Sequence, residues 1–216
     1  MTTLTELLQE KIQKSSEVIP EDKKKIMEKS TAILKGQTLA SKAIKKGDIL
    51  PEFSLPNATN KMISLSDFKN DYIIISFYRG GWCPYCNLEL KALQNILPQL
   101  SKLGAVLIAI SPETPDNSLN TTEKNNLSFS VLSDIDNKYA KSLGLVFKMP
   151  EDLQKVYKDF NLNVNQFNGN EDYELPMPAT YVVNHNREII YSFIPEDYRE
   201  RLDPEKILEI LKQNND

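Results

Sequence analysis

The residues best suited to chemistry are Cys83 and Cys86, which are the only cysteines in the chain. The single histidine, His185, lies far along the sequence in an Asn-rich turn that explains it without catalysis. A zinc site takes about four N, S or O ligands, which one cysteine pair and one distant histidine cannot supply without carboxylates. In a chain with no further cysteines, the C-x-x-C spacing indicates a redox-active dithiol. We therefore expect thiol–disulfide chemistry. We expect no metal and no organic cofactor, since the glycine pair before the cysteines belongs to no G-x-G-x-x-G pattern.

The pair stands where a buried strand meets a helix. Residues 72–78 (YIIISFY) form a β-branched and aromatic run that is typical of a central strand buried on both faces. Pro84 fits the first turn of the helical pattern that follows, which puts Cys83 at the helix N-terminus among unpaired backbone N–H groups. There the pKa of a thiol can fall from about 8.5 into the range of roughly 3.5–7.5. Cys86, one turn further on, can resolve a sulfenic acid or mixed disulfide formed on its partner.

Neighbouring side chains could take part in the reaction. Trp82, Pro84 and Tyr85 would form an apolar rim for a docking substrate. Glu89 falls one helical turn after the second cysteine, where it could exchange a proton with that thiol; the alternative is a solvated glutamate. Arg79 could stabilise a thiolate or orient a peroxide oxygen; the alternative is a surface charge at the edge of the loop.

A second segment could approach the cysteines from elsewhere in the chain. Pro178, in the sequence LPMPAT, precedes a predicted strand, and a proline there suits the start of a strand or a cis turn. A cis bond between Met177 and Pro178 would bring the backbone close to the dithiol. We therefore include Met177 and Pro178 among the candidate substrate-facing residues.

Composition and charge exclude several function classes. The chain has 216 residues with 26 Lys+Arg and 30 Asp+Glu, a formal net charge of −4. This mild acidity argues against a nucleic-acid-binding protein. No run approaches the roughly 18 apolar residues of a membrane span, and the start of the sequence lacks the basic and apolar regions of a secretory signal. We expect a cytoplasmic protein that binds neither nucleic acid nor membrane.

The composition and the hydrophobic pattern of the chain predict two structural parts. Residues 1–45 are polar and lysine-rich with two apolar patterns of helical spacing, and form an N-terminal helical extension. Residues 46–216 alternate strands with helices, which indicates an α/β domain with a sheet covered on both faces. The last two strands, 179–183 and 188–194, are joined by a tight turn and must be antiparallel, so the sheet is mixed. Residues 161–170 contain five asparagines and are predicted to be a loop.

From about residue 46 to residue 211 the chain resembles the alkyl hydroperoxide reductase/thiol-specific antioxidant family, the peroxiredoxin-like proteins with a thioredoxin fold. The segments that carry the resemblance are residues 47–55 (GDILPEFSL), 63–68 (ISLSDF), 82–86 (WCPYC) and 178–183 (PATYVV). The third is similar to the thioredoxin signature, and the fourth to the cis-proline strand of thioredoxins, which implies a cis Pro178. Glu89 matches a glutamate that related thiol reductases carry three residues after the second cysteine.

The chain also departs from that family. In typical peroxiredoxins, a strand ending in Phe-Tyr is followed by proline, three residues, threonine, two residues and the peroxidatic cysteine. This register puts Cys86 on the peroxidatic position, Cys83 on the threonine and Arg79 on the proline, and the family's arginine would fall near Pro178. The peroxide-activating threonine and arginine are therefore absent from their usual positions. The thioredoxin pattern instead makes Cys83 the attacking residue, which we favour because it is nearer the helix start and is expected to be more exposed.

These observations predict a thiol-based antioxidant oxidoreductase that cycles between a dithiol and a Cys83–Cys86 disulfide. It would reduce hydroperoxides, disulfides or both, and thioredoxin or a similar dithiol would reduce it in turn. Two alternatives remain: a thioredoxin-like disulfide reductase without real peroxidase activity, and a non-catalytic redox-sensing module that uses the N-terminal helices. The apolar stripes of those helices also suggest a homodimer.

Overall fold

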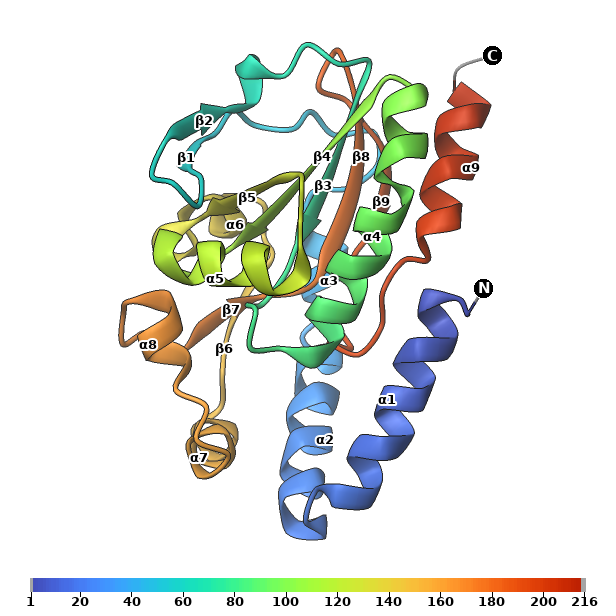
Figure 1. The fold of residues 1–216 in the computed structure, drawn as a ribbon. Helices are drawn as coiled ribbons and strands as arrows, with labels where there is room; N and C mark the ends of the chain where they lie inside the picture. Colours follow the sequence, from blue (N-terminus) through green and yellow to red (C-terminus); the bar gives the residue numbers. More distant parts are fainter. Residues whose placement is uncertain (1, 215–216) are drawn as a thin grey trace.

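A computed structural model describes residues 2–214, which fold around a five-stranded sheet with the order β5-β4-β3-β8-β9 (Figure 1). In that order the strands are Ser130–Ser133, Ala105–Ser111, Tyr72–Phe77, Ala179–Asn184 and Ile189–Phe193. β4 pairs in parallel with both β3 and β5. β8 pairs antiparallel with both β3 and β9. The predicted mixed sheet is confirmed.

Strand β3 is central because both of its faces are apolar. Every residue of this strand is buried. Tyr72 and Ile74 belong to one core cluster, whereas Ile73, Ile75 and Phe77 belong to the other. Since successive side chains of a strand point to opposite faces, a sheet covered on both sides requires an apolar run, which in β3 only Ser76 interrupts.

The core cluster around Tyr72 and Ile74 is closed by three helices, α1 (Leu4–Val18), α4 (Pro84–Lys102) and α9 (Pro204–Asn214). α4 and α9 lie side by side along the sheet (Figure 1). The opposite cluster takes up residues from the segment before β3, from α3 (Leu39–Lys42) and from α6 (Lys138–Ser142). The sheet is therefore covered on both faces, as predicted.

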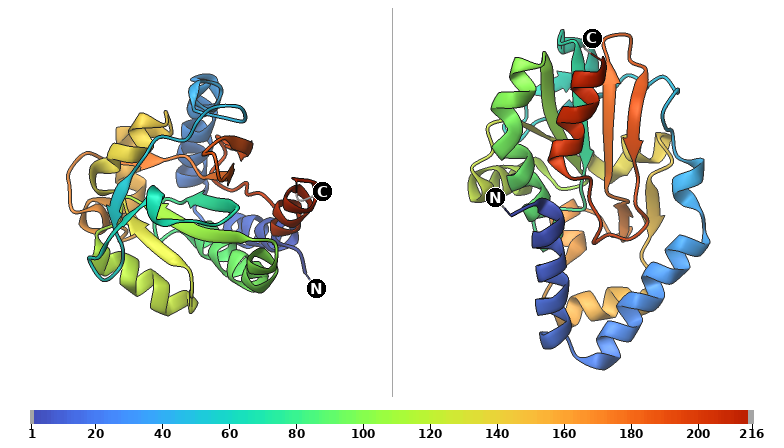
Figure 2. Two further views of the ribbon diagram at one scale, coloured as in Figure 1. Left: turned by 90° about the horizontal axis from the view of Figure 1, so that it is seen from above. Right: turned by 90° about the vertical axis from the view of Figure 1, so that its right-hand side faces the viewer.

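The N-terminal helices extend beyond one end of the sheet as a hairpin of α1 and α2 (Glu21–Gly36) (Figure 2). α1 begins with a capping box, in which the Glu6 amide donates to the Thr3 hydroxyl at 3.2 Å and the Thr3 amide donates to the Glu6 carboxylate at 2.8 Å. Leu4 and Leu8 of α1 are buried against the core that contains α4. α2 packs against α7 (Glu151–Asp159). Much of the apolar stripe of these helices is thus packed against other parts of the same chain.

The remaining elements are short. They are β1 (Ser54–Pro56), β2 (Met62–Ser64), the 3₁₀ turns η1 (Leu65–Asp67) and η2 (Ile135–Asn137), α5 (Pro115–Asn125), β6 (Val146–Lys148), α8 (Val164–Asn168) and β7 (Glu174–Pro176). The prediction of a loop over residues 161–170 is wrong at α8. The Asn163 side chain accepts from the Gln166 amide at 3.4 Å, and Gly169 ends the helix with a φ of 70°. Asparagine and glycine act here as helix caps.

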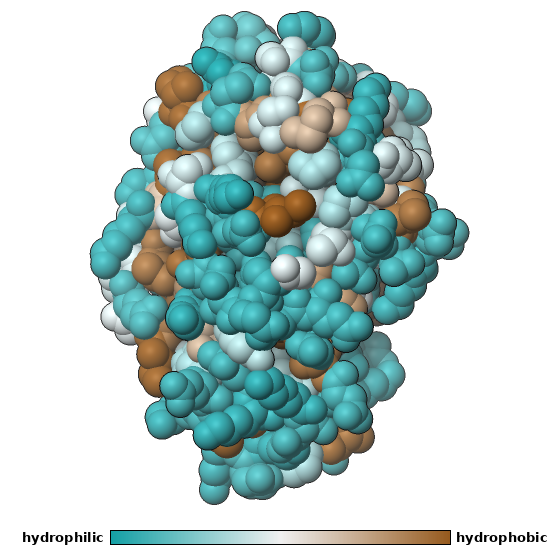
Figure 3. Space-filling model, turned by 90° about the vertical axis from the view of Figure 1, so that its left-hand side faces the viewer, coloured by the Kyte–Doolittle hydropathy of each residue, from teal (hydrophilic) through white to brown (hydrophobic). Residues whose placement is uncertain are grey.

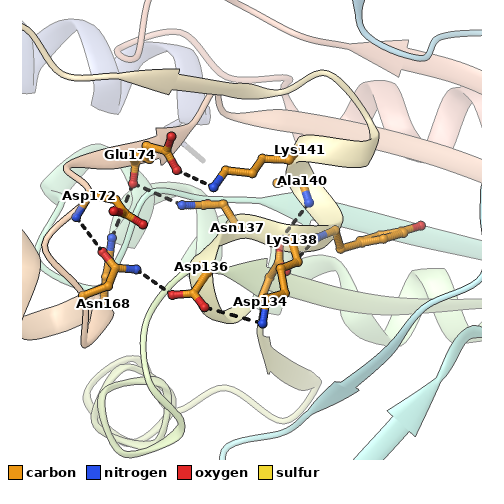
Figure 4. A network of polar contacts seen from close by, with 11 residues as sticks. Asp134, Asp136, Asn137, Lys138, Ala140, Lys141, Asn168, Asp172 and Glu174 are labelled. Atoms are coloured by element: carbon orange, nitrogen blue, oxygen red, sulfur yellow. Dashed lines mark hydrogen bonds and ion pairs between the residues drawn. The ribbon is translucent and has the colours of Figure 1, made fainter.

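A polar network next to the sheet holds β7 in place (Figure 4). The Asp134 carboxylate accepts from the amides of Tyr139 and Ala140, both at 2.8 Å, and so fixes the start of α6. Lys141 of α6 forms an ion pair with Glu174 of β7 at 2.5 Å, and the Asn137 side chain donates to the Glu174 carbonyl at 3.1 Å. These contacts tie the strand that precedes Pro178 to the body of the domain.

The surface is largely hydrophilic on the face that Figure 3 shows, with apolar residues scattered over it. Single exposed apolar side chains are normal for a folded domain. Helices able to cross a membrane are absent from residues 2–214, since each is too short or too polar.

Candidate active site

The two cysteines lie at the start of α4, directly after the loop that leaves β3. Cys83 is the N-cap residue and Pro84 is the first helical residue. The Cys83 amide donates to the Gly80 carbonyl at 3.0 Å, and the Asn87 amide donates to the Cys83 carbonyl at 3.1 Å. Both cysteines are free thiols in this structure. The predicted position of Cys83 at the helix N-terminus is therefore observed, and the positive end of the helix dipole faces it.

The glycine pair before the cysteines allows two close approaches. Gly80 has a φ of 148°, and a Cβ at this position would lie 2.2 Å from Nε1 of Trp82. A Cβ on Gly81 would lie 1.9 Å from the Thr121 hydroxyl. Only glycine lets the loop pass between the indole ring and α5 without moving either.

The Gly81 peptide is held on both sides by buried polar groups. Its N–H donates to Oε2 of Glu113 at 2.9 Å, and its carbonyl accepts from the Asn87 side chain at 2.8 Å. The Asn125 side chain in turn donates to Oδ1 of Asn87 at 2.9 Å. Burial raises the pKa of Glu113 to about 7, although the Gly81 N–H opposes this change. The loop that carries the dithiol is thus anchored to α5 and to the segment after β4.

Cys86 lies against a buried ion pair. Nη2 of Arg201 donates to the Cys86 sulfur at 3.1 Å, and its Nε lies 2.5 Å from Oε2 of Glu89. Nη1 of the same arginine donates to the carbonyls of Tyr198 and Glu200 at 2.8 and 2.7 Å. The Arg201 guanidinium therefore has a carboxylate and two carbonyls as partners in addition to the thiol.

Arg79 has a different environment. Its side chain is 2% exposed, and its Nη2 donates to the Tyr157 hydroxyl at 2.6 Å. The guanidinium carbon lies 4.6 Å from the centre of the Tyr198 ring, 5.0 Å from that of Trp82 and 5.8 Å from that of Tyr157. Among the described residues Arg79 forms no ion pair with a carboxylate, and its Nε has no hydrogen-bond partner. We refer to Arg79 with Trp82, Tyr157 and Tyr198 as the aromatic cage.

The surroundings of the two thiols give them different pKa values. Burial opposes ionisation of Cys83, but the hydrogen bond from Cys86 and the charges of Arg79 and Arg201 outweigh it and lower the Cys83 pKa from 9.0 to about 6. Burial raises the pKa of Cys86 well above its usual value, and its hydrogen bond to Cys83 raises it further. Burial also raises the pKa of Glu89 to about 7, against the opposing charge of Arg201. The site therefore favours a Cys83 thiolate beside a Cys86 thiol.

A groove of about 370 Å³ opens at Cys83. Its walls come from α1, α2, the cysteine loop, α7 and the segments that follow α7 and β9. Cys83, Arg79 and Tyr157 line it, whereas Cys86 does not. A volume in the range of roughly 300–1,000 Å³ with mainly apolar walls is typical of small-molecule sites.

The structure brings most of the sequence-predicted residues to this groove. Trp82, Pro84 and Tyr85 line it together with Arg79 and Cys83. The alternatives of a solvated Glu89 and a surface Arg79 are wrong, because these side chains are 1% and 2% exposed. The expectation of an exposed Cys83 is also wrong, since only 1% of the residue is accessible. Its advantage over Cys86 is that it borders the groove.

The prediction for the segment around Met177 and Pro178 is only partly met. Met177 and Pro178 are buried, and neither lines the groove at Cys83. The expected cis bond is wrong, because residues 2–214 contain no cis peptide. The Met177 amide donates to the Leu145 carbonyl at 2.8 Å, and Ala179 already pairs with Phe77 in the sheet. This extended pairing suits the trans form, which an X–Pro bond prefers by about 0.5–1 kcal/mol.

Four residues of the site were not identified from the sequence. They are Glu113, Tyr157, Tyr198 and Arg201. Arg201 is separated from Cys86 by 115 positions, and it follows another arginine, Arg199, so nothing local marks it as the one that reaches the thiol. Glu113 lies two residues after the end of a buried strand, which was the one available signal.

The chain is similar to known proteins. The model of the AhpC/TSA family matches residues 46–192. The peroxiredoxin Bcp of Escherichia coli is 31% identical over 102 residues, which are 47% of this chain and 65% of that protein. A putative peroxiredoxin bcp of Haemophilus influenzae is 35% identical over 99 residues, 46% of this chain and 64% of that protein. The aligned part thus spans just under two thirds of these relatives.

Solved structures show the same fold. Peroxidoxin BcpB of Mycobacterium tuberculosis aligns with a TM-score of 0.62 at 18% identity, covering 79% of this chain and 97% of that one. AhpC of Enterococcus faecalis aligns with a TM-score of 0.60 at 15% identity, covering 78% and 91%. The predicted thioredoxin-type α/β fold is confirmed.

Proposed function

Because the chain belongs to the AhpC/TSA family, we propose that it is a thiol-based antioxidant oxidoreductase that cycles between a dithiol and a Cys83–Cys86 disulfide. Its oxidant is a hydroperoxide, and thioredoxin or a similar dithiol donor reduces it. The observation that carries the proposal is the difference between the two thiols: Cys83 has a lowered pKa and borders the groove, and Cys86 is a buried thiol with a raised pKa. The naming of the Escherichia coli relative as a peroxiredoxin supports it.

The reaction proceeds in three balanced steps. The Cys83 thiolate attacks one peroxide oxygen, the O–O bond breaks, and the alkoxide or hydroxide takes a proton from solvent and leaves as an alcohol or water, so that Cys83 becomes a sulfenic acid. The Cys86 thiol then loses its proton and its sulfur attacks the Cys83 sulfur. The S–O bond breaks, the leaving hydroxide takes up a proton and is released as water, and the disulfide is formed. A donor dithiol attacks this disulfide through a mixed intermediate and leaves as its own disulfide.

We assign roles to the surrounding residues on the same basis. Arg79 and Arg201 stabilise the Cys83 thiolate. Glu89, with a pKa of about 7, accepts the proton that Cys86 loses when it attacks. Trp82, Pro84 and Tyr85 form the apolar rim. Met177 and Pro178 support the sheet rather than contact the substrate, since they lie outside the groove.

A disulfide reductase is the second candidate function. It is supported by the C-x-x-C pair at a helix N-terminus, with the first cysteine more acidic than the second. In that case the Cys83 thiolate attacks a substrate disulfide, and the Cys86 thiol releases the reduced product. The intermediate on Cys83 is then a mixed disulfide instead of a sulfenic acid.

Rapid oxidation of the reduced protein by hydrogen peroxide distinguishes the two. Trp82 is the only tryptophan and adjoins Cys83, so its fluorescence reports the change at the sulfur. A rate orders of magnitude above that of a free thiolate is expected for a peroxidase. A rate like that of an ordinary thiol, together with rapid reduction of disulfides, would contradict peroxide reduction and support the second function. The Cys86→Ser variant is the control, because it retains the first step and cannot form the disulfide.

The remaining proposals concern the domain organisation, the location and the oligomeric state of the protein. Residues 1–45 form a helical extension to a peroxiredoxin-like domain of residues 46–216, and the protein acts in the cytoplasm without nucleic-acid or membrane partners. A homodimer through the N-terminal helices would have to use the apolar residues left exposed there, of which Val18 is 77% and Ile33 is 43% exposed. Sedimentation showing only a monomer at high protein concentration would contradict the dimer.

A further inference from the structure

The groove at Cys83 is lined by two cationic side chains and by no carboxylate, so that the Cys83 thiolate is the one negative group among its lining residues. Two of its lining residues, Arg79 and Lys11, are cationic, and none of the residues that line it is acidic. Apart from Ser15 and Cys83, the rest of its wall is apolar or aromatic and includes Val18, Met27 and Phe160. The protein as a whole has a net charge of −4, so this local excess of positive charge is not a general property of its surface.

The Arg79 side chain has no carboxylate partner among residues 2–214, although a buried guanidinium needs an anion. Its Nη2 donates to the Tyr157 hydroxyl, but its Nε has no partner, and none of the ion pairs among residues 2–214 includes it. The cage rings at 4.6–5.8 Å supply cation–π attraction, worth roughly 0.5–2 kcal/mol for each favourable contact. An isolated buried charge is expensive unless it is paired. The residue therefore depends on an anion that other groups provide.

In the reduced protein that anion is the Cys83 thiolate. Once Cys83 has attacked a substrate, its sulfur is uncharged and Arg79 is left without an anionic partner. A substrate with its own negative group would restore the pairing at that point. An anionic substrate would also be attracted into the groove by Lys11, which lies on the α1 side of it.

We propose that this groove is a charge-selective subsite for substrates that carry an anionic group, such as a carboxylate, next to an aromatic or other apolar body. Arg79 and Lys11 select the anion, and the apolar wall from α1, α2 and α7 takes the body. This inference rests on the proposed thiol chemistry and adds the substrate class to it. The anionic substrate can be a disulfide or a hydroperoxide, because both oxidise Cys83 at the same sulfur.

For an aryl disulfide the steps are explicit. The Cys83 thiolate attacks one sulfur, forms a mixed disulfide and releases one aryl thiolate. Cys86 then loses its proton and attacks the Cys83 sulfur, which forms the Cys83–Cys86 disulfide and releases the second aryl thiolate. Each protein molecule is oxidised by two electrons, and each aryl disulfide is reduced by two.

The test compares two chromogenic disulfides of similar shape on the reduced protein. 5,5′-Dithiobis(2-nitrobenzoate) carries two carboxylates, whereas 2,2′-dithiobis(5-nitropyridine) is neutral. Each rate is divided by the rate of 2-mercaptoethanol, a thiol without a charged group, with the same disulfide. The readout is the normalised rate with the anionic disulfide divided by the normalised rate with the neutral one. Because both probes react with the same thiolate, a change in the Cys83 pKa cancels in this ratio.

We expect the wild-type ratio to exceed one, to fall about tenfold in Arg79→Met, and to fall about threefold in Lys11→Met. Lys102→Met is the matched control and should leave the ratio unchanged, since Lys102 is at the far end of α4, about 28 Å along the helix axis. Salt should reduce the preference. A carboxylate-bearing hydroperoxide and its methyl ester, compared in the same way, tell which kind of anionic oxidant uses the subsite.

Two results have distinct meanings. A ratio that neither Arg79→Met nor Lys11→Met changes would overturn the subsite and leave the proposed oxidoreductase function standing. If the wild-type protein reacts with neither the disulfides nor peroxide faster than a free thiol does, the proposed function fails as well. If Arg79→Met does not fold, Lys11→Glu decides the question. This variant changes the surface of α1, and a lower ratio supports the subsite while an unchanged ratio overturns it.

Discussion

The two cysteines share one turn of helix, but their arginines are in opposite situations. Arg201, at Cys86, is paired with Glu89 and donates to two backbone carbonyls. Arg79, in the groove at Cys83, has aromatic rings and one phenol hydroxyl around it, and none of the ion pairs among residues 2–214 gives it a carboxylate. The paired arginine lowers the pKa of Cys83 less than Arg79 does, because part of its charge is compensated by Glu89. An unpaired one is free to stabilise a thiolate or a bound anion.

The thiols reflect this difference. The charges of Arg79 and Arg201 both favour ionisation of Cys83, and its thiolate then discourages a second negative charge on Cys86. Two cysteines in one motif therefore obtain different roles from their surroundings, and the roles can be reversed or removed by changing those surroundings.

The largest expected effect separates the cysteines themselves. Cys83→Ser should reduce turnover with any oxidant by about a thousandfold or more, since the attacking group is lost. Cys86→Ser should retain a single rapid oxidation per molecule and stop there, with a sulfenic acid detectable by mass spectrometry. If instead Cys86→Ser loses the first oxidation and Cys83→Ser keeps it, Cys86 is the attacking residue, as the peroxiredoxin register implies.

The second prediction compares the arginines by stability. Arg201→Met leaves Glu89 buried without its cation and should lower the free energy of unfolding by about 3–5 kcal/mol. Arg79→Met leaves no carboxylate unpaired and should cost about 1–2 kcal/mol. Urea denaturation of the reduced protein at pH 8 measures both.

A double variant checks the cause of that difference. Adding Glu89→Gln to Arg201→Met removes the orphaned carboxylate and should recover a large part of the lost stability. Equal losses for Arg79→Met and Arg201→Met would contradict the distinction between a paired and an unpaired arginine.

The third prediction concerns the loop that positions Cys83 and Arg79. Gly81→Ala would place a Cβ 1.9 Å from the Thr121 hydroxyl, so the loop or α5 must shift, at a cost of about 1–3 kcal/mol. Gly36→Ala is the control, because a Cβ at Gly36 of α2 meets nothing within 4 Å; it should be neutral or stabilising by up to about 1 kcal/mol. Thermal denaturation compares the two. Similar melting temperatures would show that the loop is not tightly held.

The smallest expected effect is on the pKa of Cys83. The Cys83 pKa of about 6 predicts that alkylation by iodoacetamide falls about tenfold per pH unit below 6. Arg79→Met should raise the midpoint by about one unit, which corresponds to about 1.4 kcal/mol, and Lys102→Met should not move it. Because the pKa is lower in the folded state than the usual 9.0, the thiolate stabilises the reduced fold at high pH. That contribution is lost as the pH falls toward 6. An unshifted midpoint in Arg79→Met would show that Arg79 does not stabilise the thiolate.

Much of the architecture could be predicted because it depends on neighbours in sequence. The buried run of β3, the cysteine at the start of α4 and the hairpin of β8 and β9 each follow from local pattern and turn chemistry. One failure has a local cause and another depends on residues distant in sequence. Asparagines indicated a loop where Asn163 and Gly169 cap the helix α8, and the thioredoxin pattern implied a cis Pro178 where β-pairing accepts a trans bond.

The sequence by itself determined the fold class, the dithiol and the helix end that carries it, since each of these arises within a few residues of chain. Tertiary structure alone decided which charges surround each sulfur. Arg201 reaches Cys86 across 115 positions, and Tyr157 reaches Arg79 across 78. Electrostatic partners act through space at distances of a few ångströms, so they are known only when the chain has brought distant segments together. That packing adds the charges that distinguish the two cysteines beyond their positions at the start of the helix.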